Sequence, residues 1–227
     1  MRDSRPTASK PSADLGSVVS LDAEKLIGGG RCLAHHDGET WMVAGALPEE
    51  VVAAQPLRRR AGVVEGKTLE VVGNPHPSRL ADPCPHASHC GGCDWPHVDP
   101  SAGAALKTSV AAEAARNFPD IAARLSDAVI HRSPLGYRLR ARVHWDPERD
   151  VLGFYDHKSW LVTAIPSCRL LSPQLMSALP VLSAALRDRC PAQIDVEWIE
   201  GSDTGDAVAA LRRARSGPRS YESAWVP

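Results

Sequence analysis

The chain concentrates soft metal ligands between residues 84 and 97. This stretch, CPHASHCGGCDWPH, contains three cysteines and three histidines: Cys84, Cys90, Cys93, His86, His89 and His97. Three thiolates are one short of the four ligands that a structural zinc ion or an iron–sulfur cluster takes. The sequence therefore predicts a metal centre whose fourth ligand lies elsewhere.

Three kinds of residue could supply that ligand: one of the nearby histidines, Cys168 or Cys190. A zinc site with three cysteines and one histidine is the alternative to a cluster. Zinc sites usually use two closely spaced cysteine pairs, however, and here only Cys90 and Cys93 form such a pair. Four-iron clusters take four thiolates, often with one distant in sequence. The spacing favours a 4Fe–4S cluster, with Cys32 and Cys190 as ordinary buried residues.

The two glycines between Cys90 and Cys93 also favour a bound inorganic centre. Gly91 and Gly92 separate Cys90 from Cys93 and carry no side chains that would crowd it. Their amide groups could also point at bound sulfides and reduce the effective negative charge.

The overall composition limits the class of protein. The net charge is −1 and 21 of the 26 basic residues are arginine, so no general attraction to a polyanion is required. The first residues have no apolar core typical of a secretion signal, and no stretch approaches the roughly 18–20 apolar residues of a membrane span. Six cysteines then indicate metal or thiol chemistry rather than disulfides. We expect a cytoplasmic protein with no membrane or DNA partner.

The elements before the cysteines predict a small barrel. Residues 1–14 are polar and predict a disordered tail. Residues 15–78 contain five short apolar runs separated by turns at Gly28–Gly30, Asp37-Gly38 and Pro48, a pattern typical of an OB-like β-barrel. Residues 79–99 form the cysteine-rich loop. The fold class predicted is a multi-domain, β-rich and α+β protein.

Residues 100–227 predict a small α+β domain, which begins with a helix. Asp99 could cap this helix, with Pro100 at its first position and Pro119 closing it. Its apolar stripe would consist of Leu106, Val110, Ala114 and Phe118. A later helix is predicted from Ser172-Pro173, with a kink at Pro180.

Between these helices, YRLRARVHWD alternates as a strand does. Tyr137, Leu139, Ala141, Val143 and Trp145 would share one face, and Arg138, Arg140, Arg142 and His144 the other. A hairpin should turn near Asp156-His157. Guanidinium groups offer forked donors to phosphates, so Arg138, Arg140 and Arg142 are candidate RNA-binding residues.

Two further features are ambiguous. Residues 194–215 could form a strand, a glycine loop and a helix, or a hairpin of two strands, which we favour because no phosphate-loop motif is present. Trp95, Trp145 and Trp160 could stack unpaired bases, although Trp145 fits the core better.

Taken together, these motifs resemble the RNA (uracil-5-)-methyltransferases, and among them the ribosomal RNA branch. The resemblance rests on DPCPHASHCGGCDWPHV, Ser167-Cys168, the preceding barrel and GYRLRARVH…LGFYDHKS. It implies that the barrel is a TRAM domain, that Cys84, Cys90, Cys93 and Cys168 hold a 4Fe–4S cluster, and that the partner is ribosomal RNA.

The sequence departs from that family in two places. The family's barrel usually has a Pro-Gly-Glu turn, whereas this chain has Pro48-Glu49-Glu50, so we expect the turn to relax. The family's catalytic domain, with its S-adenosylmethionine loop and nucleophilic cysteine, would follow the last residues, and no catalytic residue is identified. We therefore expect an RNA-recognition and iron–sulfur portion that does not transfer methyl groups alone: a truncated product, a fragment, or one half of a split enzyme whose separate methyltransferase domain would bind S-adenosylmethionine. The alternatives are a free-standing RNA-binding protein with a structural cluster or zinc site, and an electron carrier.

Overall fold

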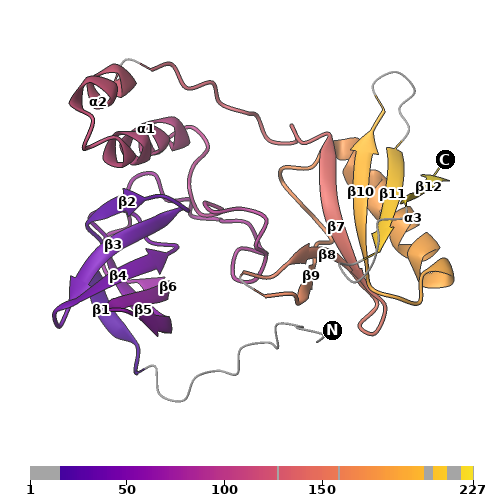
Figure 1. Ribbon diagram of the computed structural model, residues 1–227, viewed down its shortest axis with the longest axis horizontal. Coiled ribbons are helices and arrows are strands. Elements are labelled where there is room, and N and C mark those ends of the chain that lie inside the picture. Colours follow the sequence, from indigo (N-terminus) through magenta and orange to yellow (C-terminus); the bar gives the residue numbers. More distant parts are fainter. Residues whose placement is uncertain (1–15, 127, 158, 202–206, 214–220, 227) are drawn as a thin grey trace, which may run out of the picture. The chain divides into compact units, whose positions relative to one another are not determined.

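The first sheet is built from the apolar runs near the start of the chain. The computed structural model describes residues 16–126, 128–157, 159–201, 207–213 and 221–226, which excludes the predicted tail at 1–14. The chain separates into a first unit, residues 1–83 and 94–132, and a second unit, residues 84–93 and 133–227. Each of the two units contains one six-stranded sheet. Figure 1 labels the strands of both sheets.

In the first unit the predicted strands form a curled sheet. Its strands are β1 (Val19–Asp22), β2 (Lys25–Ile27), β3 (Arg31–His36), β4 (Glu39–Ala44), β5 (Val51–Arg60) and β6 (Val63–Val71). Their order is β1-β5-β6-β4-β3-β2, with only β4 and β6 parallel among these neighbours. Register shifts at Ala53/Ala54 and Pro56/Arg58 interrupt the ladder of β5 and β6. Bulges of this kind bend and twist a strand, which suits a curled sheet.

Alternation buries one face of these strands. Trp41, Val43, Val52 and Val64 are buried, and Cys32 is fully buried among them, as predicted. Helix α1 (Gly103–Ala114) lies against β2, and Leu106 and Val110 pack onto the same core. A second helix, α2 (Pro119–Ser126), follows.

The predicted start of α1 was wrong. The helix begins at Gly103, because Asp99 caps a turn that precedes it. The Asp99 carboxylate accepts a hydrogen bond from the Ser101 N–H at 2.7 Å, and its carbonyl accepts from the Gly103 N–H at 3.1 Å. Pro119 does not close α1, which ends at Ala114. It occupies the first position of α2, where a backbone N–H would have no acceptor within the helix, so the missing N–H of proline costs nothing. Phe118 is consequently exposed.

The Pro48-Glu49-Glu50 turn keeps a conformation that favours glycine. Glu49 has a φ of +67°, and its N–H donates to the Ala23 carbonyl at 2.7 Å. The expectation that the turn relaxes was therefore wrong. The bond to Ala23 and the burial of the next residue, Glu50, hold the backbone in place.

The second unit is a sheet with one helix on its face. Its strands are β7 (Arg140–Asp146), β8 (Val151–Tyr155), β9 (Val162–Ala164), β10 (Ile194–Glu200), β11 (Ala207–Arg213) and β12 (Tyr221–Val226). They are ordered β12-β11-β10-β7-β8-β9 and are antiparallel throughout. The pairing of β10 with β11 confirms the predicted hairpin of two strands, and β8 and β9 form the hairpin predicted near Asp156-His157.

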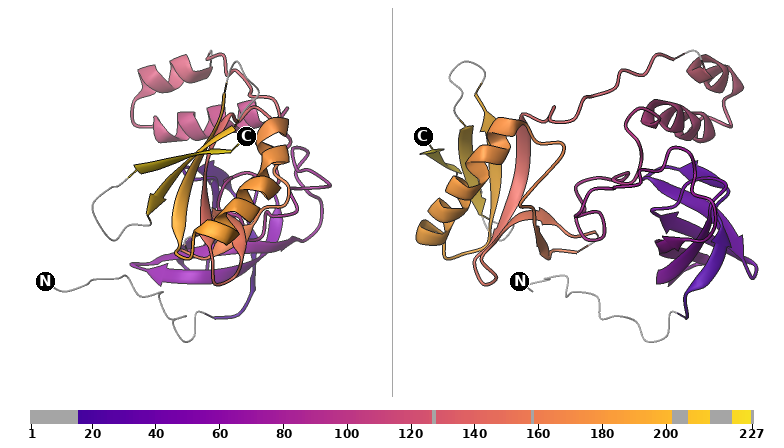
Figure 2. Two further views of the ribbon diagram at one scale, coloured as in Figure 1. Left: turned by 90° about the vertical axis from the view of Figure 1, so that its right-hand side faces the viewer. Right: turned by 180° about the vertical axis from the view of Figure 1, so that it is seen from behind.

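Helix α3 (Pro173–Arg189) covers one face of this sheet, as Figure 2 shows. Ser172 caps it by accepting a hydrogen bond from the Leu175 N–H at 3.1 Å, and Pro173 is its first residue, as predicted. Its buried leucines are Leu175, Leu179, Leu182 and Leu186. They pack with Val143, Trp145, Val196 and Trp198 into a single core.

Among the described residues, no helix has the length and apolarity that a bilayer crossing requires.

Candidate metal and RNA site

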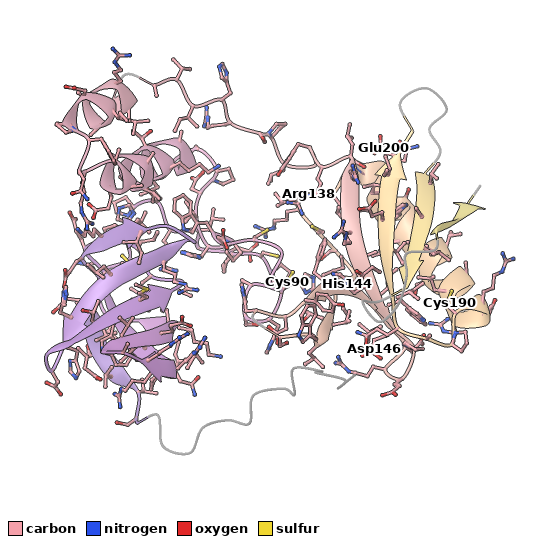
Figure 3. The ribbon with its side chains drawn as sticks, viewed as in Figure 1. Cys90, Arg138, His144, Asp146, Cys190 and Glu200 are labelled. Carbon is pink, nitrogen blue, oxygen red and sulfur yellow. The ribbon has the colours of Figure 1, made fainter. Side chains whose placement is uncertain are left out.

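All four predicted cysteine ligands lie in the second unit. Residues 84–93 belong to it although they precede the rest of it by some forty residues, because the loop pairs with the end of β8. Cys90 and Asp156 form an antiparallel bridge, and the Gly91 N–H donates to the Tyr155 carbonyl at 2.9 Å. Cys90 and Cys168 both pack against the core of this unit, and Figure 3 labels Cys90.

Two of the four thiols, Cys90 and Cys93, have raised pKa values. Burial raises the pKa of Cys93 to about 11, and the negative charges of Cys168, Cys90 and Cys84 act in the same direction. Burial also raises the pKa of Cys90, again with contributions from Cys168 and Cys84. All four cysteines, which the sequence separates, belong to the same unit.

The glycines of the loop are required by close packing. A β-carbon at Gly91 would stand 2.9 Å from the Tyr155 carbonyl oxygen, and one at Gly92 would stand 3.3 Å from the Cys90 sulfur. The Gly92 N–H points at the same sulfur, 3.4 Å away. A side chain at either position would push the loop away from β8 or press against the thiol.

The histidines of the loop have other neighbours. His86 Nε2 lies 3.3 Å from Ser167 Oγ, and His89 Nδ1 lies 3.9 Å from an Asp156 carboxylate oxygen. His97 belongs to the first unit, where it is buried. Burial and the charge of Arg79 lower its pKa to about 4, although Glu50 opposes this.

Over the described residues, no three or more His, Cys, Asp or Glu side chains converge tightly enough to hold a single metal ion. One ion needs all its ligands about 2.0–2.3 Å from a common point. A four-iron cluster binds its thiolates at separate corners and needs no such convergence. The four thiols and the glycine-lined loop are a donor set that is compatible with a 4Fe–4S cluster.

The three predicted RNA-binding arginines lie in two different environments. Arg138 precedes β7, and its N–H donates to the Leu170 carbonyl at 2.8 Å. Its positive charge acts to lower the pKa of Cys93. Tyr137 and Leu139, predicted to share the buried face of β7, are instead exposed, because the regular strand begins only at Arg140.

Arg140 and Arg142 are on the sheet face opposite α3, as the alternation predicts. Both donate to the carboxylate of Glu197 on β10, at 3.1 and 2.6 Å. The hydrogen bond between Arg142 and Glu197 is the main reason that the pKa of Arg142 is raised. Glu197 is buried while the two guanidinium groups are largely exposed, so it orients them and cancels part of their charge.

His144 does not add positive charge to this face. It is buried, its Nδ1 lies 2.8 Å from an Asp195 carboxylate oxygen, and its ring stacks on Tyr155 at 3.5 Å between centroids. Burial lowers the pKa of His144, although the hydrogen bond to Asp195 opposes this.

The sequence interpretation overlooked Asp195 and Glu197. The signal was present in IDVEWIE, where acids alternate with apolar residues as arginines do in RARVHW. The register of β7 and β10 then places Asp195 opposite His144 and Glu197 opposite Arg142. Trp145 is in the core, Trp95 is half-buried in the first unit, and Trp160 is exposed.

Comparison with known proteins identifies the relatives of this chain. No protein-family model matches it. A 23S rRNA (uracil(1939)-C(5))-methyltransferase RlmD of Pseudomonas putida is 37% identical over 204 residues, which are 87% of this chain and 44% of that protein. Proteins of the same name from Alkalilimnicola ehrlichii and Nitrosospira multiformis are 37% and 30% identical over 188 and 195 residues, covering 41% and 43% of their lengths.

These relatives confirm the resemblance. Over the matched residues, the chain is similar to the N-terminal part of these RNA (uracil-C5)-methyltransferases, and it spans less than half of their length. The curated relatives that carry this likeness are named as RlmD, methyltransferases of 23S ribosomal RNA.

Proposed function

We propose that these residues form the RNA-recognition and iron–sulfur portion of an S-adenosylmethionine-dependent methyltransferase that acts on uridine in ribosomal RNA. In this proposal the curled sheet is a TRAM-type barrel, and residues 79–99 carry the cluster loop. The observation that carries it is the gathering of Cys84, Cys90, Cys93 and Cys168 in one unit.

The surroundings of the thiols support a 4Fe–4S cluster at this position. The cluster and its four thiolates carry net negative charge, and the neighbouring guanidinium of Arg138 would offset part of it. The Gly92 N–H already points at a cysteine sulfur. Bound there, the cluster would tie the loop at 84–93 to residues 165–171 and so serve a structural purpose.

The exposed guanidinium groups support RNA binding. Arg140 and Arg142 present forked donors that Glu197 holds in place, and phosphate contacts supply most of the sequence-independent affinity for RNA. Because Glu197 cancels one of their two charges, we expect moderate affinity from this face. Specific recognition then requires additional contacts.

Salt titration of RNA binding tests this proposal. A labelled single-stranded ribosomal RNA fragment should bind the chain with a log–log salt slope of about −0.7 per neutralised phosphate. Arg140→Ala and Arg142→Ala together should flatten the slope. Adding Arg138→Ala measures how much the third guanidinium contributes to the slope. Arg187→Ala, at an exposed α3 arginine paired with Asp150, is the matched control. An equal slope in all variants contradicts the proposal.

Methyl transfer is a separate part of the proposal. The relatives extend well beyond the matched residues, so we expect the 227 residues to bind RNA without transferring methyl groups by themselves. Incubation with ribosomal RNA and labelled S-adenosylmethionine should leave the RNA unlabelled. Label incorporated by the purified chain would refute this expectation.

A further inference from the structure

The second unit has a pocket next to the turn between β8 and β9. Its volume is about 450 Å³, and it is lined by Gly91, Tyr155, Asp156, His157, Ser159 and Trp160. Trp160 is 58% exposed and meets Tyr155 edge to face, with 5.1 Å between ring centroids and an interplanar angle of 84°. A large indole face therefore borders an open cavity of the size that small ligands occupy.

The indole stands at the end of an anchored aromatic series. Tyr155 stacks on His144 with an interplanar angle of 18°, and its hydroxyl lies 3.5 Å from the Asp195 carboxylate. His144 is held by the same carboxylate. Since Asp195 lies on the central strand β10, the tyrosine that supports Trp160 is fixed before any ligand arrives. A fixed platform loses little entropy on binding.

The backbone of the cysteine loop contributes another wall. The Gly91 N–H bonds to the Tyr155 carbonyl, and the His157 N–H bonds to the His89 carbonyl at 3.1 Å. Because Gly91 has no side chain, this wall lies close to β8, and a β-carbon there would stand 2.9 Å from the Tyr155 carbonyl oxygen. The pocket therefore has a backbone wall as well as an exposed indole.

The charge in the lining selects the kind of ligand. Asp156 contributes a carboxylate, one oxygen of which accepts from the His157 N–H at 2.6 Å. Its remaining lone pairs can accept further N–H donors, whereas the negative charge repels phosphate. The ligand should be flat, aromatic and able to donate hydrogen bonds.

We propose that this pocket holds one unpaired nucleobase of the bound RNA, stacked on Trp160 with its amino or imino group directed at Asp156. The proposal rests on the proposed RNA-binding function and deepens it. Arg140 and Arg142 would contact phosphates, and the pocket would contact a base. Stacking accepts any base, and the carboxylate favours those with an exposed N–H donor.

Fluorescence anisotropy with a short, labelled single-stranded RNA of mixed sequence tests the pocket. Trp160→Ala should weaken binding by about 5- to 150-fold, the usual effect of losing one base–aromatic stack, and Trp160→Phe should keep most of the affinity. The salt slope should not change, because no phosphate contact is removed. Phe118→Ala, at an equally exposed aromatic residue of the first unit, should bind like the parent chain.

An abasic RNA of the same length separates stacking from other effects. The parent chain and Trp160→Ala should bind it equally, since it has no base to stack. If Trp160→Ala binds the base-bearing RNA as well as the parent does, or loses the same factor on the abasic RNA, the pocket inference is wrong while the RNA-binding function stands. If the parent chain shows no salt-dependent RNA binding, both proposals fail.

Discussion

At Glu49 the backbone adopts a φ of +67°, a region that a β-carbon disfavours by about 1–2 kcal/mol. Glycine adopts this conformation without strain, although it gives the unfolded chain more freedom, at a cost of about 0.5–1 kcal/mol. We therefore expect Glu49→Gly to raise the free energy of unfolding of the first unit by up to about 1 kcal/mol, measured by urea denaturation.

Glu70→Gly provides the matched control for this prediction. Glu70 is exposed on β6, and its φ is not positive. The same change there should lower the free energy of unfolding by about 0.5–1 kcal/mol, because only the entropic effect remains. Equal losses in the two variants would show that Glu49 is not strained.

Gly153 is a position where the backbone of a neighbouring strand leaves no room for a side chain. A β-carbon there would stand 1.7 Å from the Thr163 carbonyl oxygen across the β8–β9 pair. Since this neighbour is backbone, it cannot rotate away. Gly153→Ala should destabilise the second unit by at least about 3 kcal/mol, at the upper end of overpacking effects, as measured by thermal denaturation.

Gly103→Ala is the control for that substitution. Gly103 begins α1 and has open space where a β-carbon would stand. Alanine is the better helix former, so this variant should be as stable as the parent or slightly more stable. A harmless Gly153→Ala would mean that β8 and β9 are farther apart than described.

Among the elements, the turn before β5 is joined to residues 76–79 by a buried carboxylate. Glu50 is 1% exposed and accepts hydrogen bonds from the Leu47 and His76 N–H groups and two, both 2.6 Å, from Arg79. Burial acts to raise the pKa of Glu50, but these hydrogen bonds and the arginine charge outweigh it and hold the pKa below its ordinary value of 4.5.

A depressed folded pKa determines the direction of the pH dependence. The ionised Glu50 stabilises the first unit fully above its unfolded pKa, near pH 4.5, and this contribution disappears as the pH falls through the lower folded value. Glu50→Gln should cost about 3–5 kcal/mol at pH 7, because Arg79 remains without its buried partner, and should reduce the loss of stability on acidification.

Thermal unfolding followed by circular dichroism from pH 7 to below pH 4 measures this dependence. The control is Glu70→Gln, which removes an exposed carboxylate of β6 and should keep the acid profile of the parent. An identical acid profile in the Glu50→Gln variant would contradict the assignment.

Elements with a strong periodic pattern could be predicted from sequence, and those decided by competing partners could not. Ala141, Val143 and Trp145 alternate on β7, and Leu175, Leu179, Leu182 and Leu186 repeat on α3, so burial determines both. The start of α1 was missed because Asp99 can cap a turn as well as a helix. A single sequence also cannot show which strand lies beside β7, so Glu197 and its effect on the arginines were missed.

At the scale of the whole molecule, the cysteines link sequence regions that are far apart. Spacing predicted three members of the set, and resemblance supplied Cys168; the ligand assignment stays a prediction. Protein purified without oxygen should be brown and contain about four iron atoms per chain. Replacing any of Cys84, Cys90, Cys93 or Cys168 by Ser should remove the colour and lower the iron content.

Cys32→Ser and Cys190→Ser are the controls for metal content. Cys32 is in the core of the first unit, and Cys190 ends α3, where its carbonyl accepts from Trp145 Nε1 at 2.9 Å. Both variants should keep their iron if they fold. One zinc ion per chain, without iron or sulfide, would exclude the cluster.

Residues 84–93 belong to the second unit, most of which is synthesised after them, so the order of synthesis on the ribosome affects this loop. Cys93 emerges 75 residues before Cys168. At about 5–20 residues per second, three thiols wait roughly 4–15 s for the fourth. Residues 94–132, which complete the first unit, are synthesised during that interval, whereas a site that uses all four thiolates cannot close until the nascent chain has passed residue 168. If the four cysteines hold a cluster as proposed, its insertion would be a late step, and until then the early thiols would be open to oxidants and to competing metals.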